Sequence, residues 1–184
     1  METRWGTRKE ERSCLSELLG ITNGTGRRLS AICELSYDYL RLDEGPHGSI
    51  RWPASTDKMG RETVIPLSPQ VRKAIDRIQD ERTGIGAAPL LPSPEDPQKP
   101  ISRHLADAWL RKAEKLANLE SQKGSLWHGY RRKWATERKH LSDVEVAATG
   151  GCKNVQTLRT AYQQPDAETM LRVVLEAGEL SEAK

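Results

Sequence analysis

Apolar residues recur at helical spacing along much of this 184-residue chain. Val71, Ile75 and Ile78 form one such set, and Ser68-Pro69 before them offers an N-cap followed by proline at the first helical position. This pattern predicts a helix that ends near Arg82. Similar patterns predict helices over residues 8–19, 25 or 26 to 35, 102–118, 128–140, 142–148, 154–162 and 167–177.

Three short segments favour strands instead, and they are Tyr37 to Leu42, Ser49 to Trp52 and Glu62 to Leu67. Turn residues at 45–48 and 57–60 separate them, so the strands should form a small antiparallel sheet. A chain break is expected at 22–26, and residues 84–100, with their five prolines and two glycines, should be an irregular connection. The predicted fold class is mainly α with a small three-stranded antiparallel β-sheet.

Charge is distributed unevenly, although the formal net charge is only +3. Residues 103–140 contain ten Lys or Arg against four Asp or Glu, whereas the rest of the chain is balanced or acidic. A segment of this kind is typical of a surface that contacts phosphates. A solvated helix face would be the default interpretation if the segment carried nothing else.

The length fits one domain with a substantial core. Cys14, Cys33 and Cys152 are odd in number and lack metal-ligand spacing, so we expect reduced thiols in a cytoplasmic protein and no metal site. The chain has no long apolar run or signal-like start, and we expect no membrane partner.

One spacing has direct chemical consequences. His128 and Arg131 are three residues apart, so on a helix they share a face and can reach one phosphate together. Donors placed there would stabilise the negative charge that builds on a phosphodiester under attack. Tyr162 follows 34 residues after the histidine, in Arg159-Thr-Ala-Tyr-Gln-Gln-Pro-Asp166. This arrangement resembles the second active-site box of the tyrosine recombinases, the phage integrase family.

Two upstream segments strengthen the resemblance. Thr25-Gly26-Arg27-Arg28-Leu29-Ser30 resembles the family's Thr-Gly-x-Arg-x-Ser box, which assigns Arg28 as its arginine. One residue of register error would exchange Arg27 and Arg28. The segment from Lys58 to Pro66-Leu67 resembles the family's lysine-bearing β-hairpin. Together the matches cover roughly residues 12–178 in the family's order.

The resemblance implies the catalytic-domain fold of tyrosine recombinases and their chemistry, which uses no metal and no cofactor. Tyr162 would attack a phosphodiester of double-stranded DNA and form a 3′-phosphotyrosine. Arg28 and Arg131 would bind the non-bridging oxygens, Lys58 would protonate the leaving oxygen, and His128 would act as a donor or base.

Two positions depart from the family pattern. Ala31 stands where the family usually has an acid, and Cys152 follows Gly151 where the family usually has histidine or tryptophan. A thiol is only a weak donor. A degenerate remnant that binds DNA or a partner without cutting is therefore an alternative, as is a type IB topoisomerase. An unrelated helical DNA-binding module is the remaining alternative, which the Lys58 hairpin argues against.

The candidate site residues also have structural interpretations. Arg28 could be an ordinary helix cation, Lys58 a solvated turn residue, His128 a helix-start residue, and Tyr162 a buried aromatic. Trp134 and Ala135 should lie in the core, and the other histidines, His47, His104 and His140, should lie at the surface.

The resemblance also frames the ends of the chain. Residues 1–184 read as one catalytic domain, with 1–11 a possible linker from a missing N-terminal DNA-binding domain and 165–184 a C-terminal tail. The tail contains clustered apolar residues, and in this family the terminal helix commonly packs on a neighbouring subunit of a tetramer on DNA. Folding back onto its own domain is the other interpretation.

Overall fold

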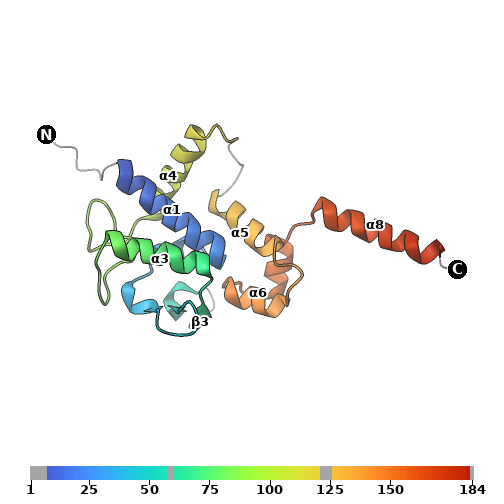
Figure 1. The fold of residues 1–184 in the computed structure, drawn as a ribbon, viewed down its shortest axis with the longest axis horizontal. Helices are drawn as coiled ribbons and strands as arrows, with labels where there is room; N and C mark the ends of the chain where they lie inside the picture. The colour runs from blue at the N-terminus through green and yellow to red at the C-terminus, as the bar shows by residue number, and fades with distance from the viewer. Residues whose placement is uncertain (1–7, 58–59, 121–125, 183–184) are drawn as a thin grey trace.

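The computed structural model describes residues 8–57, 60–120 and 126–182 (Figure 1). Helices α1 (Arg8–Thr25) and α3 (Pro69–Glu81) lie side by side, and α4 (Arg103–Leu116) and α5 (Leu126–Thr136) pack against α1. Beyond α5, α6 (Asp143–Thr149) leads into the short segments that carry Tyr162. The last helix, α8 (Ala167–Glu182), extends away from the rest of the molecule (Figure 1).

The expected break at 22–26 is wrong, because α1 continues through it to Thr25. The hydroxyls of Thr22 and Thr25 donate to the carbonyls of Leu18 and Ile21, at 2.7 and 2.8 Å. Gly24 is packed so closely on α3 that an added Cβ would lie 2.1 Å from a methyl of Val71. Tertiary packing thus overrides the low helix propensity of this segment, and α2 is only Leu29–Cys33.

The three-stranded antiparallel sheet is confirmed, in the order β1 (Leu40–Arg41), β2 (Ser49–Trp52) and β3 (Thr63–Pro66). Most of the first expected strand is wrong, since residues 37–39 form the 3₁₀ turn η1 (Tyr37–Tyr39). There the Tyr37 N–H donates to Ala88 in the irregular connection, which leaves only two residues to pair with β2. A second 3₁₀ turn, η2 (Ala54–Thr56), follows β2.

Several helix ends also differ from expectation. Helix α5 ends four residues early, because the N–H groups of Arg138 and Lys139 donate to carbonyls only three residues back. The expected helix over 154–162 is α7 (Val155–Thr157) followed by the π-helical turn η3 (Leu158–Tyr162). Helix α8 runs five residues further than expected, to Glu182. Residues 84–100 form the expected irregular connection.

Two apolar clusters make up the interior. The larger one joins the sheet to α1–α5, and the smaller one contains Trp134, Ala135, Val146, Ala147, Leu158 and Tyr162. The predicted burial of Trp134 and Ala135 is confirmed, with 3% and 1% of their surfaces exposed. His104 and His140 are exposed as predicted, and His47 is half-buried. Within the described ranges, no helix is both long and apolar enough to cross a membrane.

Gly26 is the joint between the clusters. Its φ is +62°, and an added Cβ would lie 2.2 Å from the Trp134 ring. Only glycine satisfies both conditions, because an L side chain is strained at this φ and has no space here.

We expect Gly26→Ala to destabilise the protein by about 1 kcal/mol of backbone strain plus about 1–3 kcal/mol of overpacking. Gly45→Ala is the matched control, since Gly45 has the same φ with nothing within 4 Å of an added Cβ. Urea unfolding of both variants measures the difference. Equal losses for the two variants would show that the contact with Trp134 costs nothing.

Candidate active site

Arg131 of α5 is the most enclosed member of the site, with 3% of its surface exposed. Its Nη1 donates to the carbonyls of Gly26 and Gly150, at 2.5 and 2.6 Å. Its Nη2 makes longer contacts, at 3.5 Å to the Gly151 carbonyl and 3.2 Å to the sulfur of Cys152. Arg131 therefore ties the end of α1 to the turn that follows α6.

Arg28 reaches the same turn from the other side. It ends the short connection before α2 as the N-cap residue of that helix, and its Nη1 donates to the Gly151 carbonyl at 2.9 Å. The side chain is half-buried, and its remaining amino group has no bonded partner among the described residues. Of Arg27 and Arg28, it is therefore Arg28 whose guanidinium can still donate hydrogen bonds to a ligand.

Arg27 is buried in the protein interior, a role that no pattern in the sequence indicated. Its Nη2 donates to the hydroxyl of Thr63 on β3 and to the carbonyl of Ala148 on α6, at 2.8 and 3.1 Å. Its guanidinium lies over the Trp52 ring, 4.9 Å from the centroid. Desolvation lowers the pKa of Arg27 to about 10, an effect that the charges of Arg131 and Arg28 increase. Its bonding partners lie 36 and 121 residues away, so no local pattern could have identified it.

A small open pocket of about 70 Å³ forms where these groups meet. The residues that line it are Arg27, Arg28, Leu29, Ser30, Arg103, Trp127, His128 and Arg131. None of these described lining residues is acidic, so the pocket has the charge and size for a small anion such as a phosphate group. The structure therefore brings together Arg28, His128 and Arg131, and it adds Arg27 and Arg103. Arg103 is the first residue of the basic segment 103–140, and this was the only sequence feature that pointed to it.

Tyr162 lies beside the pocket and does not line it. Its ring is 6% exposed and packs under the Arg131 guanidinium, 4.4 Å from the ring centroid. The His128 ring is stacked nearly parallel to it, at 12° and 6.1 Å between centroids. Asp143 of α6 braces this turn by accepting from Arg159 and from the Gln163 amide, at 2.7 and 3.0 Å.

Three further positions complete the comparison with the sequence. Cys152 is half-buried, and its sulfur accepts a hydrogen bond from Arg131, so it contacts the site. Ala31 is 5% exposed and belongs to the larger core. Lys58 lies outside the described residues.

The positive surroundings also act on His128. Desolvation, and after it the charge of Arg131, hold the pKa of His128 below its ordinary value of 6.5. The imidazole is consequently neutral near pH 7 and can accept a proton.

Comparison with known proteins places these features in one family. The model of the phage integrase family matches residues 7–169, and the chain belongs to that family. Its fold is that of the catalytic domain of tyrosine recombinases. No curated protein matches the sequence at a significant level.

Solved structures agree on the fold. XerA recombinase is 16% identical with a TM-score of 0.67, covering 94% of this chain and 63% of that one. XerH site-specific recombinase, in a post-cleavage complex with a palindromic difH substrate, is 16% identical with a TM-score of 0.70, over 90% and 46%. A lambda integrase dimer bound to a core site is 16% identical with a TM-score of 0.59, over 86% and 60%. The chain thus spans less than two thirds of the length of each of these three proteins.

An anion in the pocket should raise the pKa of His128, because a negative charge offsets the surrounding arginines. We expect NMR titration of the imidazole to give a pKa below 6.5 in chloride and a higher value when sulfate is added at constant ionic strength. Arg28→Gln should weaken the response to sulfate. A pKa that is insensitive to sulfate would show that no anion binds beside His128.

Proposed function

We propose that the chain is the catalytic domain of a site-specific DNA recombinase that cleaves and rejoins strands through a covalent 3′-phosphotyrosine at Tyr162. The observation that carries this proposal is the position of Tyr162, whose ring packs against both Arg131 and His128, two residues that line the arginine-rich pocket. A structural tyrosine needs no such partners, whereas a nucleophile needs a phosphate held next to it and a group to receive its proton.

The proposed step is an in-line displacement at phosphorus. The Tyr162 oxygen forms a bond to phosphorus while the bond to the 5′ oxygen breaks. Neutral His128 receives the phenolic proton, and Lys58 supplies a proton to the departing 5′ hydroxyl. The new phosphodiester retains the energy of the old one, so a 5′ hydroxyl from another strand can reverse the step and join a new end.

The two arginines divide the stabilisation of the transition state. Arg28 has N–H groups that lack a partner among the described residues, and with them it binds one non-bridging oxygen without breaking an existing bond. Arg131 offers Nη2, whose contacts to Gly151 and Cys152 are long and easily exchanged for an oxygen of the phosphate. Cys152 then serves to orient Arg131 by accepting from it, in place of an imidazole or indole that would donate to the phosphate directly.

A catalytically degenerate protein is the second candidate, favoured by Ala31 and Cys152. Ala31 leaves no carboxylate at a position where the family usually has one. The three guanidinium groups nevertheless keep their orientation through backbone carbonyls of Gly26, Ala148, Gly150 and Gly151. Since carbonyls perform the positioning, the missing acid does not by itself disable the site. A type IB topoisomerase is the third candidate, and strand exchange distinguishes it.

We further propose that the protein binds double-stranded DNA and assembles on it as a tetramer. The basic segment 103–140 supplies phosphate contacts around the pocket. Helix α8 supplies the contact between subunits, because Met170, Leu171, Val173, Val174 and Leu175 are 53–68% exposed along it. A helix that extends away from its own domain with so much apolar surface gains stability when a neighbour covers that surface.

Covalent trapping tests the proposed chemistry. A pool of nicked duplexes with randomised sequence should leave wild-type protein attached to DNA on a denaturing gel, since the short cleaved fragment diffuses away. Tyr162→Phe should abolish the band, and Arg28→Lys should reduce it about 100-fold. Tyr39→Phe, in the 3₁₀ turn η1, is the matched control. DNA binding without any adduct would support the degenerate protein, and plasmid relaxation without strand exchange would support the topoisomerase.

Substitutions on α8 test the assembly. Leu171→Gln with Val174→Gln should reduce the mass of complexes on a two-site duplex, because they remove apolar area that a neighbour would bury. Arg172→Gln, between them in sequence, controls for a change on the same helix. Unchanged mass for the double variant, measured by light scattering, would exclude this helix as the subunit contact.

A further inference from the structure

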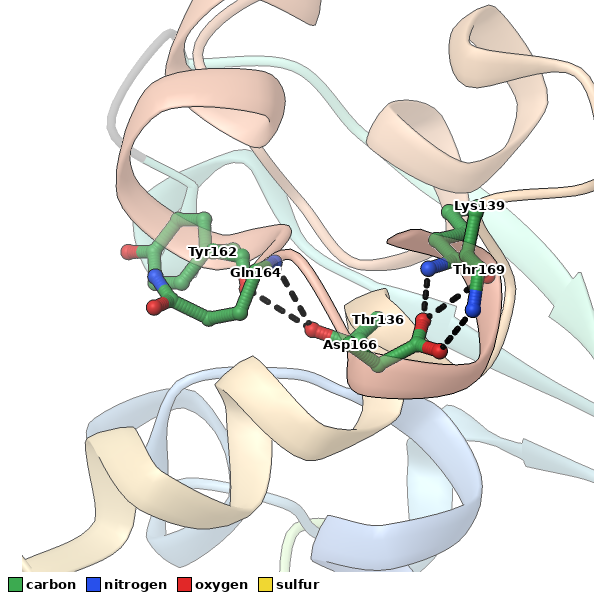
Figure 2. Close-up of polar contacts among 6 residues, drawn as sticks. All are labelled: Thr136, Lys139, Tyr162, Gln164, Asp166 and Thr169. Carbon is green, nitrogen blue, oxygen red and sulfur yellow. Dashed lines mark hydrogen bonds and ion pairs between the residues drawn. The ribbon is translucent and has the colours of Figure 1, made fainter. Parts of the chain in front are cut away.

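The segment that follows Tyr162 is bonded back to α5, the helix that carries His128 and Arg131 (Figure 2). The hydroxyl of Thr136, the last residue of α5, accepts the N–H of Gln164 at 3.0 Å. The same hydroxyl donates to the Tyr162 carbonyl at 3.4 Å. A single side chain thus holds the backbone on both sides of Gln163.

A second contact joins the same two segments, three residues beyond Thr136 and two residues beyond Gln164. The ammonium of Lys139 pairs with the carboxylate of Asp166, with both side chains partly shielded from solvent. Asp166 also caps α8, since its Oδ1 accepts the Thr169 N–H at 2.9 Å and its Oδ2 accepts the Thr169 hydroxyl at 3.1 Å. The start of α8 is therefore fixed to the turn that follows α5.

We propose that Thr136, Lys139 and Asp166 form a latch that positions Tyr162 relative to its activating residues and sets the direction in which α8 leaves the domain. These are positioning residues, and their proposed effect rests on the function given above. The latch joins the nucleophile to the same helix as His128 and Arg131, so all three move together.

Geometry supports this role more strongly than energy does. A partly exposed ion pair contributes little to global stability, and the α8 cap is retained without Lys139. What the latch changes is freedom of position, because Tyr162 lies in a π-helical turn followed by four residues outside any helix or strand. A displacement of about 1 Å at a reacting atom can cost about 100-fold in rate. In Figure 2 the Tyr162 side chain points away from the latch, and the hydrogen bonds of Thr136 go to the backbone, so the latch acts on the backbone and not on the ring.

The variants separate position from charge. Thr136→Val removes the hydroxyl but keeps the shape. Lys139→Met and Asp166→Asn each break the ion pair but change the net charge in opposite directions, and asparagine still caps α8. Lys139→Arg keeps the pair. Lys73→Met is the control for a lost cation, because Lys73 is exposed on α3 and lies outside the basic segment 103–140.

With DNA at saturation, we expect Thr136→Val, Lys139→Met and Asp166→Asn each to slow covalent trapping about 10-fold to 100-fold. Lys139→Arg and Lys73→Met should trap like wild type. An electrostatic effect on DNA would instead make Lys139→Met and Asp166→Asn change affinity in opposite directions. Wild-type trapping rates in all three latch variants, or faster ones, would overturn the proposal.

Hydrogen exchange without DNA tests the latch independently of catalysis. Thr136→Val should speed exchange of the Gln164 amide while the Thr169 amide, bonded to Asp166, stays protected. Unchanged exchange at Gln164 would overturn the latch even if the wild-type enzyme cleaves DNA. Absence of any wild-type adduct, together with the expected exchange, would overturn the proposed function and leave only the structural part of the latch.

Discussion

The buried guanidinium of Arg131 is the interaction on which the site depends. Burying a cation is costly unless its donors are satisfied, and here backbone carbonyls of Gly26 and Gly150 satisfy Nη1. Carbonyls can reach it only where the backbone comes close. This explains why glycine occupies the end of α1 and the turn after α6, with Trp134 filling the space that side chains would need. The same contact joins the two apolar clusters of the domain, so folding and assembly of the site are one event.

Because carbonyls are uncharged, they satisfy the hydrogen bonds of the arginines without cancelling their charge. Arg131 and Arg27 each retain a buried Nε–H without a partner among the described residues. Desolvation, and after it the charge of Arg131, lowers the pKa of neighbouring His128, and positive charge is concentrated at the pocket that Arg28 and Arg103 also line. An anion that enters the pocket reduces the electrostatic repulsion between the arginines that line it. For the proposed reaction, the groups that would stabilise developing charge are therefore in place before DNA binds, which is the arrangement that electrostatic catalysis requires.

Sequence reasoning succeeded where the information is local. The spacing of His128 and Arg131 is a property of one helix, and Ser68-Pro69 caps α3 as expected, with the Ser68 hydroxyl accepting the Val71 N–H. It failed where distant packing decides the outcome. Thr22 to Thr25 resembles a break until α3 packs on it, and Arg27 resembles a spare cation until Thr63 and Ala148 bind it. The contacts of Thr136 and Asp166 were equally out of reach, because they join segments about 28 residues apart that only the fold brings together.

Tyr162 belongs to the smaller cluster, and this has consequences for how its reactivity can be controlled. The larger cluster fixes Arg27 and Arg28 through α1, whereas the tyrosine depends on α6, on the π-helical turn and on the end of α5. A π-helical turn is rare and frequently occurs at functional sites, and here it carries the proposed nucleophile at its last residue. Since α8 begins five residues after Tyr162, a neighbouring subunit that pulls on α8 in the proposed assembly would act on the tyrosine through Asp166. When the proposed latch is released, the nucleophile can move while the arginines stay fixed, so phosphate binding and cleavage can be controlled separately.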